Sequence, residues 1–214
     1  MHTNSLSEAS WPDWTGETAL IVGTGPSASS EDLRFTQGRV RTFVIKSTWR
    51  LAPWADALYG LDRGWWVANQ GARKFHGLKF SPSPTVTNVY RDVRRVRLRP
   101  VANLLTAETG VIGCGLRTGG GHSGFQAINL AIQFGVRRLL LVGFDMTLEN
   151  GAHWLIDDRG VGKPDDGRVR SWRESMDACA PQFKTLGVEV MNCTPRSALK
   201  AYPKTTVGEA LGWL

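Results

Sequence analysis

Short apolar runs recur along the chain, separated by glycine-rich turns or by segments with helical spacing. Thr18 to Val22 is an apolar run rich in β-branched residues, and the turn Gly23 to Ser27 follows it. Ser29 to Asp32 are residue types that begin helices, so the stretch predicts a strand, a glycine turn and a helix. Arg41 to Ile45 and Ala57 to Leu61 predict two more strands. This order is typical of repeated β/α units.

The pattern continues beyond the glycine-rich segment Gly113 to Gly121. Ser123 is a natural N-cap, and apolar residues recur after it at helical spacing until Gly135, a natural stop signal. Arg138 to Val142 then predicts a buried strand that ends in Gly143-Phe144-Asp145. Helix-then-strand order therefore persists in the second half of the chain.

The last third predicts one more helix and strand. Apolar residues fall at four- and three-residue steps from Trp172 to Leu186, with Pro181 expected to kink or split the helix. Gly187 ends it, and Val188 to Met191 reads as a strand. The whole pattern predicts an α/β sandwich with a mainly parallel sheet flanked by helices.

Arginines alternate with apolar residues between Arg91 and Arg99, as in an exposed or edge strand. Two interpretations remain open for this stretch. The first is a solvated arginine face. The second is a surface that follows the phosphates of a nucleic acid, although aromatic residues for base stacking are not interleaved with the arginines.

Composition limits the protein class. The 214 residues, 42% hydrophobic and 21% charged, suit one globular domain over 17–214 with an N-terminal tail over 1–16, which Trp11 and Trp14 are expected to pin to the body. A net charge of +7 favours anionic partners. The three cysteines fit neither a disulfide framework nor a metal-ligand spacing. No apolar run is long enough to span a membrane, so we expect a soluble protein in the cytoplasm.

Polar residues collect immediately after the predicted strands. In an open parallel sheet, ligands bind outside the carboxyl ends of the strands, where loops meet helix N-termini. The residues at those ends form the candidate site: Gly23 to Ser27, Lys46, Ser47, Asp62, Asp145, and Asn192 to Ser197.

The turn after the first strand partly matches a dinucleotide-binding fingerprint, as Gly23-x-Gly25-x-x-Ala28. That fingerprint expects an acidic residue at the end of the second strand, where Lys46 stands instead, so NAD is disfavoured. Pro26 also removes one amide donor. The turn therefore favours contact with a nucleotide or sugar phosphate over a full dinucleotide cradle.

Four motifs occur together and in order: Ile21 to Ser27, Ser123-Gly124, Leu141 to Asp145, and Asn192 to Leu199. This set resembles the superfamily of small bacterial sialyltransferases that use CMP-sialic acid and of archaeal-type 6-hydroxymethylpterin diphosphokinases. The segment Trp49 to Asp62, with Trp65-Trp66 and His153-Trp154, is most similar to the uncharacterised phage-borne branch. The resemblance covers about Ala19 to Pro203.

The resemblance implies a Rossmann-like nucleotide-binding fold. It places Gly23, Gly25, Pro26 and Ser27 near a phosphate or sugar, and Ser123 and Gly124 near the base and ribose. For the two serines, simple helix capping is the alternative interpretation. We include Lys46, Ser47, His122, Asn192 and Ser197 among the nucleotide-binding candidates, and Asp62, Trp65, Trp66 and Trp154 among the substrate-binding ones.

The chain departs from the sialyltransferase pattern at two positions. Thr147 stands where a tyrosine steadies the departing phosphate, and no histidine follows His153. His153 is then the candidate general base, since an imidazole accepts a proton near neutral pH. Asp145 is its catalytic partner in this hypothesis, with binding of a substrate hydroxyl and capping of the next loop as the alternatives. Arg117 and Lys46 are candidates to stabilise the leaving phosphate.

The segment around 150–170 is expected to be a mobile loop. Its acidic residues, Asp157, Asp158, Asp165 and Asp166, are interpreted as solvated charge rather than a metal site. Trp154 would provide an apolar wall or a stacking platform, and Asp62 is equally compatible with a simple turn.

The leading functional hypothesis is a nucleotide-dependent, glycosyltransferase-like transferase that moves a group from a sugar nucleotide to an acceptor hydroxyl. One alternative is diphosphate transfer from ATP, which would require magnesium. Another is a non-catalytic phage protein for nucleotide binding or assembly, in the host cytoplasm. A homo-oligomer and a nucleic-acid acceptor also remain open.

Overall fold

Seven parallel strands form the central sheet, in the order β5-β4-β3-β2-β1-β8-β9. The computed structural model describes residues 11–30, 32–118, 121–155 and 158–212. The strands are β1 (Thr18–Val22), β2 (Arg41–Ile45), β3 (Ala57–Tyr59), β4 (Leu78–Ser81), β5 (Val93–Arg95), β8 (Arg138–Val142) and β9 (Glu189–Asn192). The predicted α/β fold with a mainly parallel sheet is confirmed.

The chain order reverses at the middle of this sheet. From β1 the chain moves outward through β2, β3, β4 and β5, and then returns to place β8 on the other side of β1. Between the two halves, β6 (Arg97–Arg99) and β7 (Val111–Gly113) pair as a separate parallel ribbon. The boundary between β1 and β8 is therefore the topological switch point, where open α/β sheets bind their ligands.

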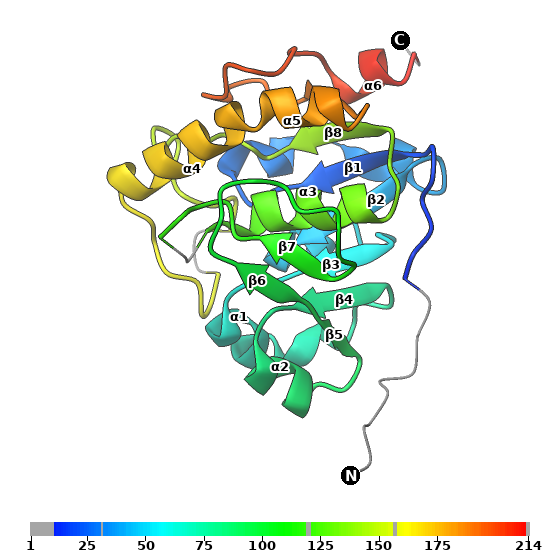
Figure 1. The fold of residues 1–214 in the computed structure, drawn as a ribbon. Coiled ribbons are helices and arrows are strands. Elements are labelled where there is room, and N and C mark those ends of the chain that lie inside the picture. The colour runs from blue at the N-terminus through cyan, green and yellow to red at the C-terminus, as the bar shows by residue number, and fades with distance from the viewer. Residues whose placement is uncertain (1–10, 31, 119–120, 156–157, 213–214) are drawn as a thin grey trace.

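Helices cover both faces of the sheet. In Figure 1, α1 and α2 lie beside β4 and β5, whereas α4 and α5 lie near β8. The α-helices are α1 (Arg63–Ala68), α2 (Pro84–Val89), α3 (Ser123–Gln133), α4 (Asp166–Ala178), α5 (Ala180–Thr185) and α6 (Val207–Ala210). Short 3₁₀ helices are η1 (Pro26–Ser30), η2 (Leu33–Thr36), η3 (Lys46–Arg50) and η4 (Gln70–Ala72). Within the described ranges, no helix combines the length and apolar character needed to cross a bilayer.

The central strands β1, β2, β3 and β8 are buried on both faces because apolar residues point alternately to the two sides. Ile21 and Phe43 pack into the core on one face, and Leu20 and Val44 pack into the core on the other. The short continuous apolar runs of the sequence follow from this two-sided burial. α3 contributes Phe125 and further apolar residues to the first of these cores.

The described part of the N-terminal segment packs on the body, as its tryptophans predict. The Trp14 ring lies edge-on to Phe134 at a centroid distance of 4.9 Å, and Trp11 stacks on Phe80 at 5.6 Å. The Gly16 amide donates to the Gly135 carbonyl at 3.0 Å. Residues 1–10 of the predicted tail lie outside the described residues.

Two predicted elements differ from the structure. The helix predicted after the glycine turn is instead the pair η1 and η2. Serines disfavour α-helix interiors because they hydrogen-bond nearby backbone, and the Ser29 hydroxyl donates to the Pro26 carbonyl at 3.2 Å. The third strand ends at Tyr59 rather than Leu61. The next carbonyl, that of Gly60, accepts a hydrogen bond from the Trp66 indole at 2.9 Å and is not available to a neighbouring strand.

Other predicted features are confirmed. The arginine stretch contains the edge strand β5, as predicted, but its second half is β6 of the separate ribbon, so it forms two short strands and not one. The last long helix divides into α4 and α5 at Cys179, two residues before Pro181. Gly135, with φ of 97°, follows the end of α3 in the left-handed region that favours glycine.

Candidate functional site

A cavity of about 370 Å³ opens at the carboxyl ends of β1 and β8. Its volume is within the range of small-ligand sites. Seven segments line it: the turn Gly23–Gly25, Ile45 and Lys46 at the end of β2, Leu61 and Asp62 after β3, the start of α3 (Gly121–Gly124), the loop after β8 (143–148), Ala152 with His153, and Val161 to Trp172 in part. The cavity therefore occupies the topological switch point of the sheet.

The glycine turn is shaped by close packing against the end of β8. A Cβ on Gly23 would lie 2.6 Å from the Gly143 carbonyl oxygen, and one on Gly25 would lie 2.0 Å from Oδ2 of Asp145. Gly143 itself has φ of 71° and would clash with Gly23 if substituted. Glycine is required at these positions because two backbone segments touch.

The amides of this turn are already used within the protein. Gly23 donates to the Val142 carbonyl at 2.7 Å, and Gly25 donates to the Gly143 carbonyl at 2.9 Å. The Ser27 amide donates to the Asp145 carboxylate at 3.3 Å. These three amides therefore bond to β8 and its loop, whereas the amides of a phosphate-binding turn point to the ligand.

Asp145 is buried beneath the turn, with 4% of its surface exposed. Burial raises the pKa of its carboxyl, and hydrogen bonds from Ser27 oppose that shift. The stronger of these bonds is the 2.8 Å contact from the Ser27 hydroxyl. The carboxylate therefore fastens the turn, and among the hydrogen bonds of the described residues none joins Asp145 to His153.

His122 is the N-cap of α3, a position that the sequence pattern assigned to Ser123. Its extended backbone places Nδ1 where it accepts the Phe125 amide at 3.2 Å. Nδ1 must carry a lone pair to do so, which puts the proton of the neutral ring on Nε2. Burial, with a smaller contribution from the charge of Lys46, lowers the pKa of His122 from 6.5 to about 3. The ring is therefore neutral at physiological pH.

His153 lines the opposite part of the cavity on the loop after β8. Its Nδ1 lies 3.1 Å from the Thr24 hydroxyl, and the amide of Trp154 donates to the Thr24 carbonyl at 2.9 Å. Burial lowers the pKa of His153, and the positive charge of Lys46 lowers it further; the nearby Asp158, the Gly162 backbone and Asp62 offset part of the shift. This imidazole is also neutral at physiological pH.

Lys46 supplies a fixed positive charge at the cavity. Its ammonium lies 3.0 Å from the Asp62 carboxylate, and only 7% of its surface is exposed. The backbone of Lys46 has φ of 50°, which is uncommon for a residue with a Cβ, and this conformation occurs where β2 ends and η3 begins.

The cavity brings together nine of the residues predicted for the site. They are Gly23, Gly25, Lys46, Asp62, His122, Ser123, Gly124, Asp145 and His153. Chain positions up to 130 residues apart meet here because all of them follow the carboxyl ends of parallel strands or begin α3.

The other predicted site residues have contacts elsewhere in the protein. Trp65 and Trp66 are fully buried in the core, with their indoles bonded to the Ser47 hydroxyl and the Gly60 carbonyl. They stabilise the core and do not line the cavity. The remaining ones outside its lining are Pro26, Ser27, Ser47, Trp154, Asn192 and Ser197.

Ser197 and Asn192 organise the backbone beneath the site. The Ser197 hydroxyl donates to the Phe144 carbonyl at 2.6 Å. The side-chain oxygen of Asn192 accepts the Thr194 amide at 3.1 Å. Ser197 therefore supports the loop after β8, and Asn192 supports the turn after β9.

The described parts of the predicted mobile loop contact the body. Asp158 is buried and accepts the Ser47 hydroxyl at 2.5 Å, which contradicts its interpretation as solvated charge. Asp165 caps α4 by accepting the Arg168 amide at 2.7 Å. Asp157 lies outside the described residues. Within the described ranges, no group of three or more His, Cys, Asp and Glu side chains is arranged to hold a metal ion.

Several lining residues were missed by the sequence analysis. Trp172, Arg168 and Lys163 reach the cavity from α4 and the segment before it. Arg117, proposed from sequence to stabilise a phosphate, is exposed and is not part of the lining. The helical spacing that begins at Trp172 indicated an apolar helix face. Nothing in the neighbouring sequence indicates that this face borders the cavity.

The fold and the site define an α/β protein with a small-ligand cavity at its switch point. No protein-family model matches the chain, and no curated protein matches it in sequence. Among solved structures, the chain is similar to the sialyltransferase CstII from Campylobacter jejuni, determined in complex with the substrate analogue cytidine-5'-monophosphate. The TM-score is 0.54 at 11% identity, and the match covers 89% of this chain and 85% of that one. At this identity the likeness establishes a shared fold.

Proposed function

We propose that the chain is a nucleotide-dependent, glycosyltransferase-like enzyme, which transfers a group from a sugar nucleotide to an acceptor hydroxyl. The observation that carries this proposal is the cavity at the β1–β8 switch point, bordered by the N-terminus of α3. A helix N-terminus favours phosphate oxygens through its unpaired amides and its dipole. The shared fold with a sialyltransferase that binds a cytidine nucleotide supports the same class.

His153 is the general base in this proposal. When its Nδ1–H donates to the Thr24 hydroxyl, Nε2 carries a lone pair for the acceptor proton. His122 is unsuited to that task, because its proton is on Nε2 and Nδ1 is engaged in the helix cap. The acceptor oxygen forms the new bond to the sugar carbon as the sugar–phosphate bond breaks and the nucleotide leaves with the electron pair.

Lys46 is proposed to stabilise the leaving phosphate. Thr147 lines the cavity but cannot supply the phenol that the sialyltransferase pattern has at that position. The Lys46 ammonium is held by Asp62 and needs no reorganisation as negative charge develops. Asp145 retains a positioning role, since it holds the turn that carries Thr24.

A thermal-shift panel tests nucleotide binding. It contains CMP, CDP, UMP, UDP, ADP, ATP and NAD, each with and without magnesium. A ligand at 100 times its Kd stabilises a protein by about 2.7 kcal/mol. For a domain of this size the rise in Tm is roughly 5 to 10 °C. We expect it with a cytidine or uridine nucleotide. No shift with any compound would overturn the proposal, and a shift confined to ATP with magnesium would replace it with diphosphate transfer.

Two buried lysines allow a matched comparison. Lys46→Met removes the charge in the cavity, whereas Lys79→Met removes a similarly buried charge that pairs with Asp92 outside the cavity. We expect the first to weaken nucleotide binding at least tenfold and the second to leave the Kd within twofold. Equal effects of the two substitutions would show that Lys46 does not contact the nucleotide.

A further inference from the structure

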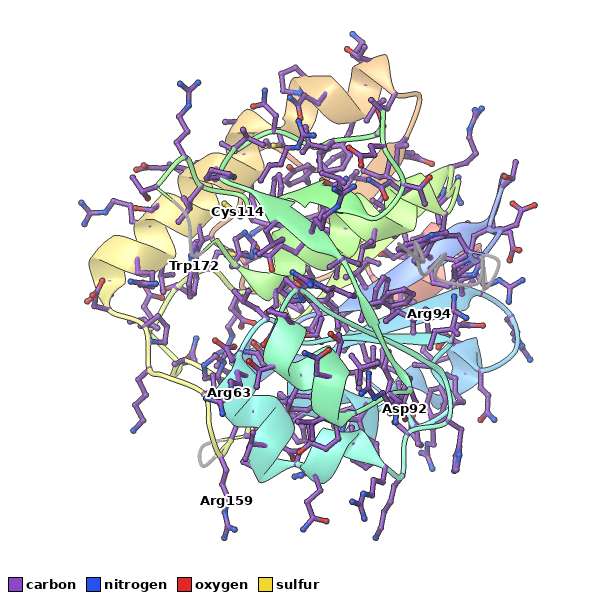
Figure 2. All side chains as sticks on the ribbon, turned by 60° about the horizontal axis from the view of Figure 1, so that its bottom comes forward. Arg63, Asp92, Arg94, Cys114, Arg159 and Trp172 are labelled. Carbon is purple, nitrogen blue, oxygen red and sulfur yellow. The ribbon has the colours of Figure 1, made fainter. Side chains whose placement is uncertain are left out.

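Two hydrogen-bond donors without partners meet at one wall of the cavity. Nε2 of His122 and Nε1 of Trp172 are buried and form no hydrogen bond with any described residue. The two rings lie 5.6 Å apart between centroids at an interplanar angle of 39°, and both residues line the cavity. Trp172 belongs to α4 and is labelled beside that helix in Figure 2. His122 is the N-cap of α3.

The protonation state of both groups is determined by the structure. Because the Phe125 amide occupies Nδ1 of His122, Nε2 of the neutral ring bears hydrogen and can only donate. An indole nitrogen is always a donor. A buried donor without a partner is destabilising, so an acceptor from a ligand would satisfy both groups.

Neighbouring groups favour a charged acceptor over a neutral one. The amides of Ser123 and Gly124 begin α3 and precede its first intrahelical bonds, at the positive end of the helix dipole. Arg168 lies one turn before Trp172 on α4 and also lines the cavity. Donor-bearing residues from α3 and α4 thus line this wall together.

The coincidence of the two donors distinguishes this place from others in the protein. The indole nitrogens of Trp49, Trp54 and Trp154 are also buried without a partner, but none of these residues lines the cavity. A single unpaired indole is therefore no indication of a site. In the glycine turn, by contrast, the amides of Gly23 and Gly25 already donate to backbone carbonyls.

We propose that His122 and Trp172 form a subsite for an oxyanion, the phosphate or carboxylate group of the ligand that enters the cavity. Nε2–H of His122 and Nε1–H of Trp172 each donate to one of its oxygens. The subsite rests on the proposed function for the identity of the whole ligand. It places the anionic group at the α3–α4 wall and away from the glycine turn.

The test follows the indole N–H of Trp172 in the full chain labelled with ¹⁵N-tryptophan. Loss of one cross-peak in Trp172→Phe assigns the resonance. The probes are sodium phosphate and sodium acetate, titrated separately at constant ionic strength, and cytidine as an uncharged control. Saturable movement of the Trp172 peak with phosphate alone would identify a phosphate subsite, and with acetate alone a carboxylate subsite. An unmoved peak with both anions would overturn the proposal.

Variants separate a direct contact from a distant effect. His122→Asn retains a side-chain acceptor for the helix cap, but its shorter side chain cannot place a donor where Nε2 lies. We therefore expect anion affinity to fall about 10-fold or more, as for loss of a hydrogen bond to a charged group. Trp54→Phe removes an equally unpaired indole away from the cavity and should leave the titration unchanged. Equal anion affinity in wild type and His122→Asn would contradict the subsite.

The outcome is separable from that of the proposed function. Nucleotide binding in the thermal-shift panel without movement of the Trp172 peak by either anion would retain the nucleotide proposal and reject this subsite. Anion binding at Trp172 without binding of any nucleotide would retain the subsite and reject the transferase.

Discussion

Acidification should destabilise the folded protein through one buried histidine. The folded-state pKa of His122 is about 3, against 6.5 for an unperturbed imidazole. Below pH 6.5 the unfolded chain therefore binds a proton at His122 that the folded protein excludes. The free energy of unfolding is full above pH 6.5 and decreases as the pH falls from there toward 3.

The magnitude follows from the size of the interval. Each pH unit below 6.5 favours the protonated unfolded state by about 1.36 kcal/mol. Over the 1.5 pH units from 6.5 to 5.0, His122 alone therefore lowers the free energy of unfolding by about 2 kcal/mol. Burial is the main cause, since the ring is 7% exposed and Nδ1 is engaged as the helix cap.

The assay is urea unfolding of wild type, His122→Asn and His76→Asn at pH 7.5 and 5.0, followed by tryptophan fluorescence and linear extrapolation. Asn preserves a capping acceptor, so the variant should fold. We expect the wild type to lose about 2 kcal/mol more than His122→Asn over this interval, because contributions of other groups are common to both. His76 is exposed, and its variant should follow the wild type. Equal losses in wild type and His122→Asn would refute the reasoning.

Three other substitutions test the site. Gly25→Ala should cost about 1 to 3 kcal/mol in urea unfolding because its Cβ meets the Asp145 carboxylate, whereas Gly162→Ala, with open space around it, should cost much less; equal costs would contradict the packing argument. Ser27→Ala should destabilise by about 1 to 3 kcal/mol in the same assay, since it leaves the buried Asp145 with fewer donors, and an unchanged unfolding curve would contradict it. With the true substrates, His153→Ala should lower kcat about 10²- to 10⁴-fold. It should also remove the fall in rate at acid pH, where the wild-type imidazole, whose pKa burial lowers, takes up a proton; a proportional loss of nucleotide affinity would make His153 a binding residue.

The sequence predicted the central strands well because they are buried on both faces, but it gave no prediction for β4 (Leu78–Ser81) or β7 (Val111–Gly113). Continuous apolar runs such as Thr18–Val22 and Arg138–Val142 leave few alternatives to a parallel sheet. The same logic placed the turn Gly23–Ser27 and Asp145 in one candidate site. Position after a strand was therefore a sufficient signal for much of the cavity.

Side-chain direction was the part that sequence could not supply. Trp65 and Trp66 follow a strand as Asp62 does, yet α1 turns both of them into the core. Trp172 looked like an ordinary apolar helix position, and its place in the cavity depends on how α4 packs against the start of α3. The cap of α3 shifted by one residue because the extended backbone of His122 can offer Nδ1 to the helix.

The predicted role of the glycine turn changed for a tertiary reason. The pattern Gly23-x-Gly25 is typical of phosphate-binding turns, where glycine admits a ligand close to the backbone. Here the close neighbour is the chain itself, at Gly143 and Asp145. A sequence alone does not reveal which of the two partners requires the glycine.

A crystal structure grown with cytidine monophosphate tests the central claim most directly, because that claim concerns where a nucleotide binds. We predict that the nucleotide lies in the cavity between the ends of β1 and β8, with phosphate oxygens within hydrogen-bond distance, about 3 Å, of Nε2 of His122 or the amides of Ser123 and Gly124. An ordered nucleotide elsewhere on the protein, or an empty cavity at a concentration that saturates binding in solution, would contradict the account.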